Sequence, residues 1–364
     1  MLCKDVYELQ DTRLAKRFQD EVLESLVEGY YKVDAWGQIG EIKNIEDFRC
    51  KVGVHTYDDL RKYIGKVIRG EYRVLLKEPP IFFGLTFGST GKRKVIPFTG
   101  AYMHKLGKVF ERAIIEVLER AKLSHVLNGF CLNLNLPSRV KDVNGVPMGF
   151  VSGLNALTVE ERFHFKLAPS QREIDSIEPK LGRDSWMKKY SLVTEKYLGH
   201  DIRYTFGIPR FLLELGKYMR RNVGWKPSEL WNIEVMFLSG VAGIYSKYAE
   251  RLKYMYGKAK LYEVYGATEG LFAQQIDDRH ALTFNFDMYL FEVKKGKKFK
   301  MLYELRRGEW GELVVSTDIF PRYLIGDLVT CIKPGLYRVY GRTHKRNLLK
   351  LYALDVFEAI LSLL

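Results

Sequence analysis

The stretch Ile81-Phe-Phe-Gly-Leu-Thr-Phe-Gly-Ser-Thr-Gly-Lys-Arg-Lys-Val-Ile-Pro-Phe-Thr99 contains two apolar runs separated by a loop of glycine, hydroxyl and basic side chains. The runs Ile81–Leu85 and Val95–Phe98 have the length and composition of short strands. Glycines let backbone N–H groups approach an anion closely, and hydroxyls and a lysine add donors and positive charge. The loop between the strands is therefore predicted to bind phosphate, with an ordinary turn as the alternative.

This loop matches neither of two common nucleotide-binding patterns. The pattern Gly-x-x-x-x-Gly-Lys-Ser/Thr requires a hydroxyl residue after Gly91-Lys92, but Arg93 stands there. The first glycine of that pattern is replaced by Thr86. A Gly-x-Gly-x-x-Gly opening a helix is also absent from the loop. The phosphate-binding hypothesis therefore depends on what the rest of the chain supplies.

The composition is that of a globular protein with an ample core. The chain has 364 residues, of which 47% are hydrophobic and 28% are charged, and this length suggests two domains or one large domain with an appendage. No apolar run is long enough to span a bilayer, and residues 1–18 carry acids and bases throughout, so neither a membrane span nor a signal peptide is expected. The four cysteines are scattered without a Cys-x-x-Cys pair, which favours reduced thiols in the cytoplasm and argues against zinc.

The formal net charge of +14 raises the question of a nucleic-acid partner. Basic residues are interleaved with acidic ones along nearly the whole chain, so nucleic-acid binding is not expected as the main role. A phosphorylated substrate or an acidic partner explains the sign of the charge equally well. Glutamine is scarce while Lys, Arg, Glu, Tyr and Ile are abundant, which is weakly consistent with a thermophilic source.

The first 280 residues alternate between helical and strand patterns. Apolar side chains recur at helical spacing in segments 13–29, 56–69, 100–122, 211–221 and 245–256. Strand patterns are predicted at residues 130–136, 233–238 and 260–264, and a glycine-containing loop at residues 138–155. In helix 56–69, Thr56 and Asp59 form a capping-box pattern. This alternation predicts an α/β sheet.

From residue 281 the pattern becomes purely β. Six short runs separated by turn residues indicate an antiparallel meander or small barrel, at residues 281–286, 288–293, 299–305, 312–317, 327–333 and 336–340. The chain closes with one short helix predicted at residues 354–363. We therefore predict a large α/β domain over residues 1–340, with its β-rich part at about 281–340, followed by a hinge and remnant of a further domain at 341–364.

Three glycine-containing loops follow or interrupt the predicted strands in the second half of the chain. Ser239-Gly-Val-Ala-Gly243 follows the strand 233–238, and Tyr265-Gly-Ala-Thr-Glu-Gly270 follows the strand 260–264. Arg322-Tyr-Leu-Ile-Gly-Asp327 comes next, and a Gly-Arg pair ends at Arg342. Taken alone, each is as easily an ordinary turn or helix entry.

In order and spacing these loops resemble the adenylate-forming superfamily of acyl-CoA synthetases, adenylation domains and luciferases. Within it, the chain looks most like the auxin-responsive acyl-acid amido synthetases and their prokaryotic relatives. The supporting stretches are Val54-His-Thr-Tyr-Asp-Asp-Leu-Arg-Lys-Tyr-Ile64 and the loop ending Lys94-Val-Ile-Pro-Phe-Thr99. Phenylacetate–CoA ligase-like enzymes are the next neighbours, and the Gly308-Glu-x-Gly-Glu-Leu313 segment suits them equally.

The resemblance implies a site for ATP and Mg²⁺. The glycine- and hydroxyl-rich loop would wrap the β- and γ-phosphates, Thr268 would bind the α-phosphate, and Glu269 would hold Mg²⁺, a hard cation that prefers oxygen ligands. Lys94 would supply positive charge during the reaction and, with Thr268 and Glu269, act as a catalytic residue. The loop residues implied in binding are Thr86, Gly88, Ser89, Thr90, Gly91 and Lys94.

The same resemblance implies a binding place for the nucleoside. Small residues Gly240, Val241 and Ala242 would lie along one face of the adenine, and Tyr265 and Gly266 would cover the other. A carboxylate offers two oxygens to a diol, so Asp327 would accept both ribose hydroxyls. Arg342 would approach the same hydroxyls or the phosphate. Two positions depart from the family pattern, because Phe87 replaces a small polar residue and Leu324 replaces an arginine.

The reaction that the resemblance implies is attack of a carboxylate on the α-phosphorus of ATP, giving acyl-AMP and pyrophosphate. The acyl group would then pass to an amine or amino acid, or to CoA. The superfamily's small mobile domain after the Gly-Arg pair is expected to be missing, and a separate polypeptide is one way to supply it. An alternative in a different class is a nucleotide- or acyl-binding subunit with little activity of its own.

Overall fold

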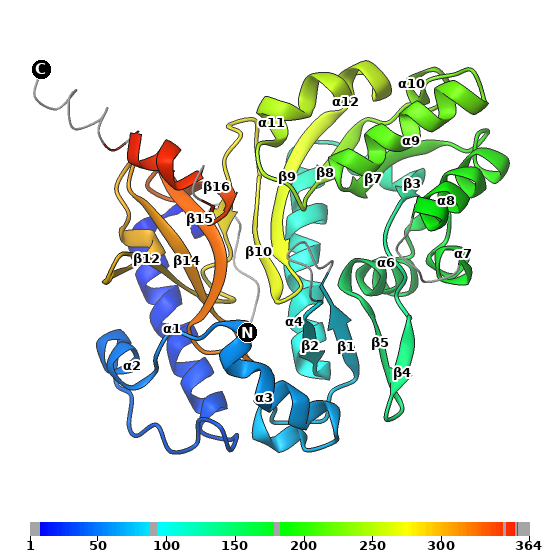
Figure 1. The fold of residues 1–364 in the computed structure, drawn as a ribbon. Coiled ribbons are helices and arrows are strands. Elements are labelled where there is room, and N and C mark those ends of the chain that lie inside the picture. The colour runs from blue at the N-terminus through cyan, green and yellow to red at the C-terminus, as the bar shows by residue number, and fades with distance from the viewer. Residues whose placement is uncertain (1–7, 87–92, 178–182, 345–346, 354, 356–364) are drawn as a thin grey trace, which may run out of the picture. The chain divides into compact units, whose positions relative to one another are not determined.

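The computed structural model describes residues 8–86, 93–177, 183–344, 347–353 and 355, and the chain forms two compact units (Figure 1). Unit 1 comprises residues 1–80, 99–112 and 269–364, and unit 2 comprises residues 81–98 and 113–268. Both units mix helices with strands, so the α/β fold class is confirmed. The domain boundaries inferred from the sequence stay a prediction.

Unit 2 is built on five parallel strands in the order β9-β8-β7-β3-β6 (Figure 1). Helices α9 (Pro209–Asn222) and α12 (Ala249–Tyr256) pack against this sheet, where Leu212, Met236 and Leu252 are fully buried. The strands are β3 (Phe130–Asn133), β6 (Lys166–Ala168), β7 (Ile202–Gly207), β8 (Val235–Leu238) and β9 (Lys260–Ala267).

A second, smaller sheet of unit 2 carries the glycine-rich loop. Strand β1 (Phe82–Leu85) pairs antiparallel with β2 (Val95–Phe98) and parallel with β5 (Val146–Phe150), which pairs with β4 (Lys141–Val143). The two predicted strands that flank the loop are therefore confirmed. The remaining helices of unit 2 are α5 (Val117–Arg120), α6 (Val151–Arg162), α7 (Gln171–Ser176), α8 (Arg183–Lys196), α10 (Pro227–Leu230) and α11 (Ile244–Lys247).

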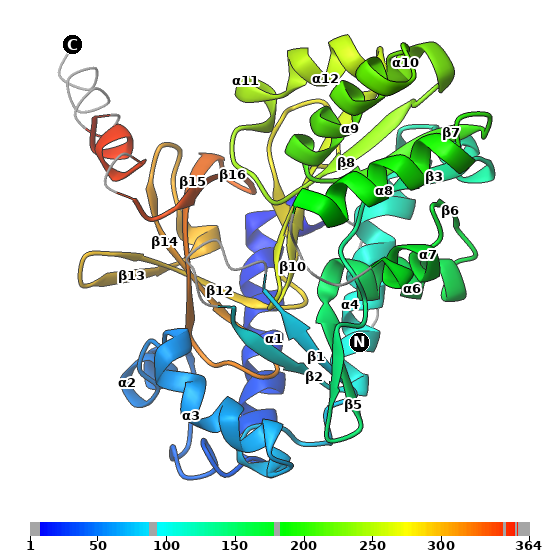
Figure 2. The same cartoon turned by 45° about the vertical axis from the view of Figure 1, so that its right-hand side comes forward.

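Unit 1 contains an antiparallel sheet in the order β13-β12-β14-β15-β16, with helix α1 (Thr12–Tyr30) against it (Figure 2). The buried amide of Gln19 on α1 donates to the carbonyls of Phe286 and Tyr289 and accepts from the Phe291 N–H, which ties the helix to β12. The strands are β12 (Leu290–Lys295), β13 (Lys298–Met301), β14 (Trp310–Ser316), β15 (Tyr323–Lys333) and β16 (Leu336–Arg342).

The other elements of unit 1 include two helices expected from the sequence. Helices α1 and α3 (Tyr57–Ile68) confirm the segments 13–29 and 56–69, and the Thr56 N–H donates to Asp59 at 2.7 Å as the capping pattern predicts. The rest are α2 (Ile45–Lys51), α4 (Gly100–Glu111) and the hairpin of β10 (Gly270–Gln274) and β11 (Thr283–Phe284).

The predicted loop at residues 138–155 is wrong, because this segment holds β4, β5 and the start of α6. Its glycines serve close packing. A Cβ at Gly149 would lie 2.0 Å from the Ser138 carbonyl oxygen, and one at Gly153 would lie 2.2 Å from that of Leu136. The predicted strand 130–136 also ends early, at Asn133, whose side chain accepts from the Asn135 N–H and turns the chain.

The long helix predicted at 100–122 is interrupted by a π-helical turn at Arg112–Glu116. Arg112 is fully buried, and its guanidinium pairs with Asp287 at 2.6 Å and donates to Asn285 at 3.0 Å. At the end of the chain, residues 347–353 are helical, and all of the predicted helix 354–363 except Asp355 lies outside the described residues.

Candidate functional site

The ends of the glycine-rich loop are fixed by hydrogen bonds across β1 and β2. The Thr86 N–H donates to the Lys94 carbonyl at 3.1 Å, and the Lys94 N–H donates to the Thr86 hydroxyl at 2.9 Å. Thr86 therefore uses both its main chain and its side chain to close the loop. The tip, with Gly88, Ser89, Thr90 and Gly91, lies outside the described residues.

Thr268 lies beside the strand that leads into this loop. A Cβ at Gly84 on β1 would be 3.2 Å from the Thr268 methyl group and 2.5 Å from the Phe98 ring. Only glycine therefore leaves room for this close approach. Thr268 therefore lies beside Gly84, which precedes Thr86 by two residues in the chain, and both predicted phosphate-binding residues belong to unit 2.

The two predicted adenine-binding segments of unit 2 belong to neighbouring, paired strands. Leu238, the last residue of β8, pairs with Glu263 on β9. Residues 240–242 come just after β8, whereas residues 265–266 lie inside β9, so the predicted start of a loop at Tyr265 is wrong. Gly240 has a φ of +76°, which favours glycine, and packs on Ile208. Tyr265 is nearly buried.

Glu269 begins the part of the chain that returns to unit 1, and its side chain is only 5% exposed. The Tyr102 hydroxyl on α4 donates to the Glu269 main-chain carbonyl, and Tyr323 on β15 is a neighbour of the Glu269 carboxylate. Burial and the neighbouring Glu269 carboxylate raise the pKa of Tyr323, so its hydroxyl remains a donor at physiological pH.

Asp327 and Arg342 face each other across β15 and β16. The two residues are register partners, and the Arg342 Nε lies 3.6 Å from an Asp327 carboxylate oxygen. The prediction that the Gly-Asp pair lies at a strand end is wrong, because Asp327 is inside β15. A bulge interrupts β15 there, because the three residues between Leu324 and Leu328 lie opposite the single residue Leu313 of β14. Gly326 has a φ of +86°, which allows the backbone to form this bulge.

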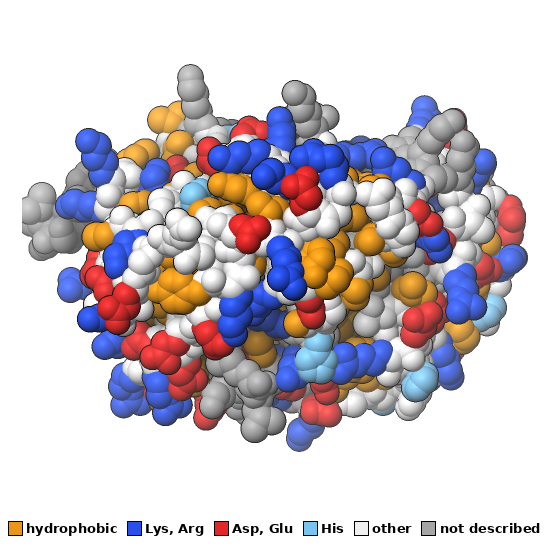
Figure 3. All heavy atoms as spheres, turned by 90° about the horizontal axis from the view of Figure 1, so that it is seen from below, with side chains coloured by type: hydrophobic (Ala, Val, Ile, Leu, Met, Phe, Trp, Pro, Cys, Tyr) orange, Lys and Arg blue, Asp and Glu red, His pale blue; other side chains and the backbone are white. Residues whose placement is uncertain are grey.

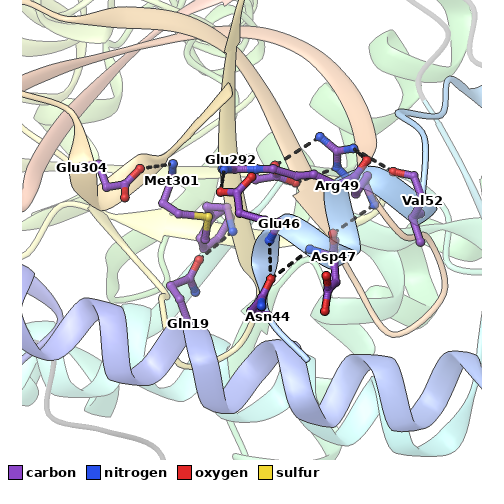
Figure 4. Close-up of polar contacts among 12 residues, drawn as sticks. Gln19, Asn44, Glu46, Asp47, Arg49, Val52, Glu292, Met301 and Glu304 are labelled. Atoms are coloured by element: carbon purple, nitrogen blue, oxygen red, sulfur yellow. Dashed lines mark hydrogen bonds and ion pairs between the residues drawn. The ribbon is translucent and has the colours of Figure 1, made fainter. Parts of the chain in front are cut away.

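A buried ion cluster anchors the chain just before Tyr323 (Figure 4). Glu292 on β12, 1% exposed, accepts from Arg49 at 2.8 Å and from Arg322 at 2.9 and 3.2 Å. Arg322 also donates to the carbonyls of Arg49 and Val52 at 3.2 and 2.7 Å. The cluster joins the C-terminal end of α2 to β12 and to the residue that precedes β15, so it fixes where β15 begins.

The carboxylates of the candidate site suit a metal ion that is coordinated mainly by water and phosphate oxygens. The described residues contain no group of three or more His, Cys, Asp or Glu side chains that could hold an ion. Mg²⁺ keeps several waters and is usually held by one or two carboxylates plus phosphate oxygens. A single buried carboxylate at Glu269 therefore fits Mg²⁺ bound to a triphosphate.

Each unit thus assembles its own share of the predicted site residues. Unit 1 brings Glu269 and Tyr323 together, and places Asp327 against Arg342. Unit 2 joins Thr86 to Lys94, places Thr268 beside Gly84, and holds residues 240–242 just after β8 and residues 265–266 within β9. Sequence reasoning missed Tyr102 altogether and gave no role to Arg322 or Tyr323, although both lie in a segment that the resemblance quoted.

On the face shown in Figure 3, basic and acidic side chains are interleaved, as they are along the sequence. Within the described ranges, no helix combines the length and low charge that a bilayer-spanning segment requires.

Solved structures define the class of the fold. The chain is similar to GH3.15 acyl acid amido synthetase, with a TM-score of 0.72, 16% identity, and coverage of 91% of this chain and 68% of that one. The same enzyme in complex with 2,4-DB gives a TM-score of 0.72 and 18% identity, with coverage of 94% of this chain and 72% of that one. A 2-hydroxyisobutyryl-CoA ligase in complex with 2-HIB-AMP and CoA gives a TM-score of 0.65 and 15% identity, with coverage of 92% of this chain and 69% of that one. The fold is that of the adenylate-forming enzymes.

Residues 8–181 match the model of the GH3 family N-terminal domain. This part of the chain is therefore similar to the GH3 family N-terminal domain, in agreement with the resemblance to the acyl-acid amido synthetases that the sequence motifs indicate. None of the curated proteins matches the chain.

Proposed function

We propose that this protein is an ATP- and Mg²⁺-dependent ligase that activates a carboxylic acid as an acyl-adenylate. The observation that carries the proposal is the placement of Glu269. Glu269 is buried, its main-chain carbonyl accepts from the Tyr102 hydroxyl, and it directly follows a threonine that packs beside a strand flanking the glycine-rich loop. A buried carboxylate next to a hydroxyl residue, in a chain with a glycine- and hydroxyl-rich loop, suits a magnesium triphosphate.

The chain's own residues would divide the work of the first half-reaction. Attack of a carboxylate on the α-phosphorus brings two anions together, so the site must supply positive charge and donors where charge develops. Lys94 and Arg342 carry such charge, and the Thr86 loop and Thr268 offer hydroxyl and main-chain donors. Bound Mg²⁺ would neutralise charge on the phosphate oxygens. Asp327 would accept the ribose hydroxyls, and residues 240–242 and 265–266 would enclose the adenine.

For the second half-reaction we propose transfer of the acyl group to an amine or amino acid, as in an acyl-acid amido synthetase. CoA is the second candidate acceptor, favoured by the similarity to a CoA ligase. A separate polypeptide could contribute to this step. Product formation by the protein incubated with ATP, a carboxylic acid and either an amino acid mixture or CoA separates the two acceptors by mass spectrometry.

Acid-dependent ATP–pyrophosphate exchange tests the adenylation step without assuming an acceptor. The probes are phenylacetate, benzoate, indole-3-acetate and 2-hydroxyisobutyrate, each assayed with Mg²⁺ and ATP. We expect exchange with at least one acid and a loss of at least about 100-fold in Glu269→Ala, since metal coordination stabilises the transition state by several kcal/mol. Glu24→Ala, an exposed acid on α1, is the control. Full exchange in Glu269→Ala would refute the metal assignment, and retention of ATP without exchange would favour a binding subunit.

A further inference from the structure

A groove runs between helices α9 and α12 of unit 2, and none of the predicted ATP-binding residues lines it (Figure 1). Leu213 and Met255 form its floor, because they line it and are only 4% and 7% exposed, whereas the lining residue Tyr254 is 56% exposed. A Cβ at Gly216 on α9 would lie 3.2 Å from the Met255 sulfur, so this glycine lets the two helices pack closely. The groove is therefore an apolar depression built by the packing of α9 on α12.

The size of the groove indicates what kind of occupant fits it. Its cavity volume is about 250 Å³. Pockets that bind small molecules typically have volumes of about 300–1,000 Å³, so this groove is small for a metabolite. It has room for one or two apolar side chains. A side chain that belongs to another protein is therefore a better match than a free small molecule.

Cations outnumber acids around this groove. Lys217 and Arg251 line it, and Glu250 is the one acid among the lining residues. Earlier on α9, Arg210 and Glu214 neutralise each other in an ion pair at 2.9 Å. Within the described ranges, no ion pair is formed by the exposed cations that follow on α9 and α12, which are Lys217, Arg220, Arg221, Arg251 and Lys253. This surplus of positive charge is complementary to an acidic partner.

Aromatic side chains accompany these cations. The Arg220 guanidinium carbon lies 6.0 Å from the centroid of the Tyr254 ring, and the Lys226 ammonium lies 5.0 Å from it. Trp225, the residue before Lys226, is 54% exposed. Trp, Tyr and Arg are the residues that most often dominate binding between proteins. A nucleic-acid base would have to displace the cations to stack on Tyr254, and a flat membrane surface would not reach the floor of the groove, so a protein segment is favoured.

We propose that the groove between α9 and α12 binds an acidic segment of another protein. The segment inserts one or two apolar side chains against Leu213 and Met255, and its carboxylates pair with Lys217 and Arg251. Burial of a leucine side chain contributes about 1.5–3 kcal/mol, so the insertion supplies affinity. The charge pairs supply specificity and speed association. This surface gives the protein a binding role beyond the proposed ligase activity.

Fluorescence anisotropy with a synthetic peptide tests the proposal on the full chain. The probe is the fluorescein-labelled peptide Gly-Glu-Asp-Glu-Leu-Leu-Glu-Asp-Glu-Gly, and a matched peptide with alanine in place of both leucines keeps its charge. We expect the leucine peptide to bind at least about 10-fold more tightly than the alanine peptide. The double variant Lys217→Glu, Arg251→Glu should bind it at least about 10-fold more weakly than wild type, and Tyr254→Ala about 5-fold more weakly.

The matched control is Lys16→Glu with Lys188→Glu, since both lysines are exposed, lie on α1 and α8, and change the net charge by the same amount. It should leave peptide binding unchanged. Equal affinity for the two peptides, or an equal loss in this control, would overturn the proposal, because binding would then depend on net charge alone. No binding of the leucine peptide by the wild-type protein would overturn it as well. The comparison of the two peptides uses the wild-type protein, so it decides the matter even if a variant fails to fold.

Two further probes distinguish a protein partner from other acidic partners. They are a fluorescein-labelled thymidine oligonucleotide and vesicles of phosphatidylserine and phosphatidylcholine. We expect both to bind more weakly than the leucine peptide. Tighter binding of either probe, lost in Lys217→Glu, Arg251→Glu but kept in the control, would overturn the proposal and assign the surface to nucleic acid or to a membrane.

Discussion

The two units hold different kinds of predicted site residues. Unit 1 offers charged side chains, with Glu269 in the turn before β10 and Asp327 paired with Arg342 across β15 and β16. Unit 2 offers main chain, hydroxyls and glycines, as at Thr86, Thr268 and residues 240–242. The position of a buried charged side chain depends on the groups that it is paired with. The position of a glycine-rich main chain depends on the space that remains where side chains are absent. Unit 1 should therefore be sensitive to lost partners and unit 2 to added volume.

The largest effect should come from breaking the ion cluster of unit 1. Arg322→Met leaves the buried Glu292 carboxylate with Arg49 alone and removes donors to two main-chain carbonyls. Loss of one partner of a buried ion pair destabilises a protein by about 3–5 kcal/mol. We expect a decrease of that order in the free energy of unfolding, measured by urea denaturation. Arg61→Met, which breaks an exposed pair with Asp58, should change it by less than about 1 kcal/mol. Equal effects of both variants would contradict the contrast.

An added methyl group should act on unit 2. In Gly84→Ala the new Cβ would lie 2.5 Å from the Phe98 ring and 2.8 Å from a Val151 methyl group. Overpacking of this kind costs about 1–3 kcal/mol and should displace Thr268, so ATP–pyrophosphate exchange should fall as well. In Gly199→Ala nothing lies within 4 Å of the new Cβ, and neither stability nor exchange should change measurably. Wild-type exchange in Gly84→Ala would show that this close approach does not serve the site.

One buried lysine sharpens the comparison, because unit 2 handles its charge differently from unit 1. Lys189 is buried, lies over the Trp186 ring at 4.1 Å and donates to the Asn135 carbonyl. Burial lowers the pKa of Lys189 to about 7, although Asp175 opposes the shift. Between about pH 7 and 10 the folded protein therefore holds fewer protons than the unfolded chain, and this lysine destabilises the fold less as pH rises.

The expected result is a pH-dependent difference between wild type and Lys189→Met. The variant should have the larger free energy of unfolding relative to wild type at pH 6.5, and this advantage should shrink by about 3 kcal/mol by pH 9.5, measured by urea denaturation. Lys188→Met, which removes the exposed neighbouring lysine, should show no such trend. A constant difference across this range would mean that Lys189 stays charged in the folded protein.

Local patterns were enough to predict much of the fold. Helices α1 and α3 follow from amphipathic spacing and a capping pair, and β1 and β2 follow from apolar runs around a glycine-rich loop. The interior strand position of Asp327 could not be predicted, because the bulge at Gly326 is set by pairing with β14. The segment 138–155 was taken for a loop because glycines in sequence do not reveal whether they serve flexibility or close packing.

The candidate site shows the same division. Thr268, Glu269 and Asp327 stand in recognisable segments, so the family resemblance could assign their roles. The residues that hold Glu269 could not be found in that way. Tyr102 is 167 positions from Glu269, and Arg322 acts through Glu292 on another strand. Only the folded chain brings such residues together.

ATP binding by variants of each unit tests the central claim most directly. Lys94→Ala removes a charge at the loop of unit 2, and Asp327→Asn weakens a carboxylate of unit 1. A hydrogen bond to a charged group contributes about 1.5–3 kcal/mol, so each variant should weaken ATP binding roughly 10-fold or more, measured by equilibrium dialysis with Mg²⁺. The account predicts that the double variant binds ATP more weakly than either single variant. Unchanged ATP affinity in either single variant would contradict it.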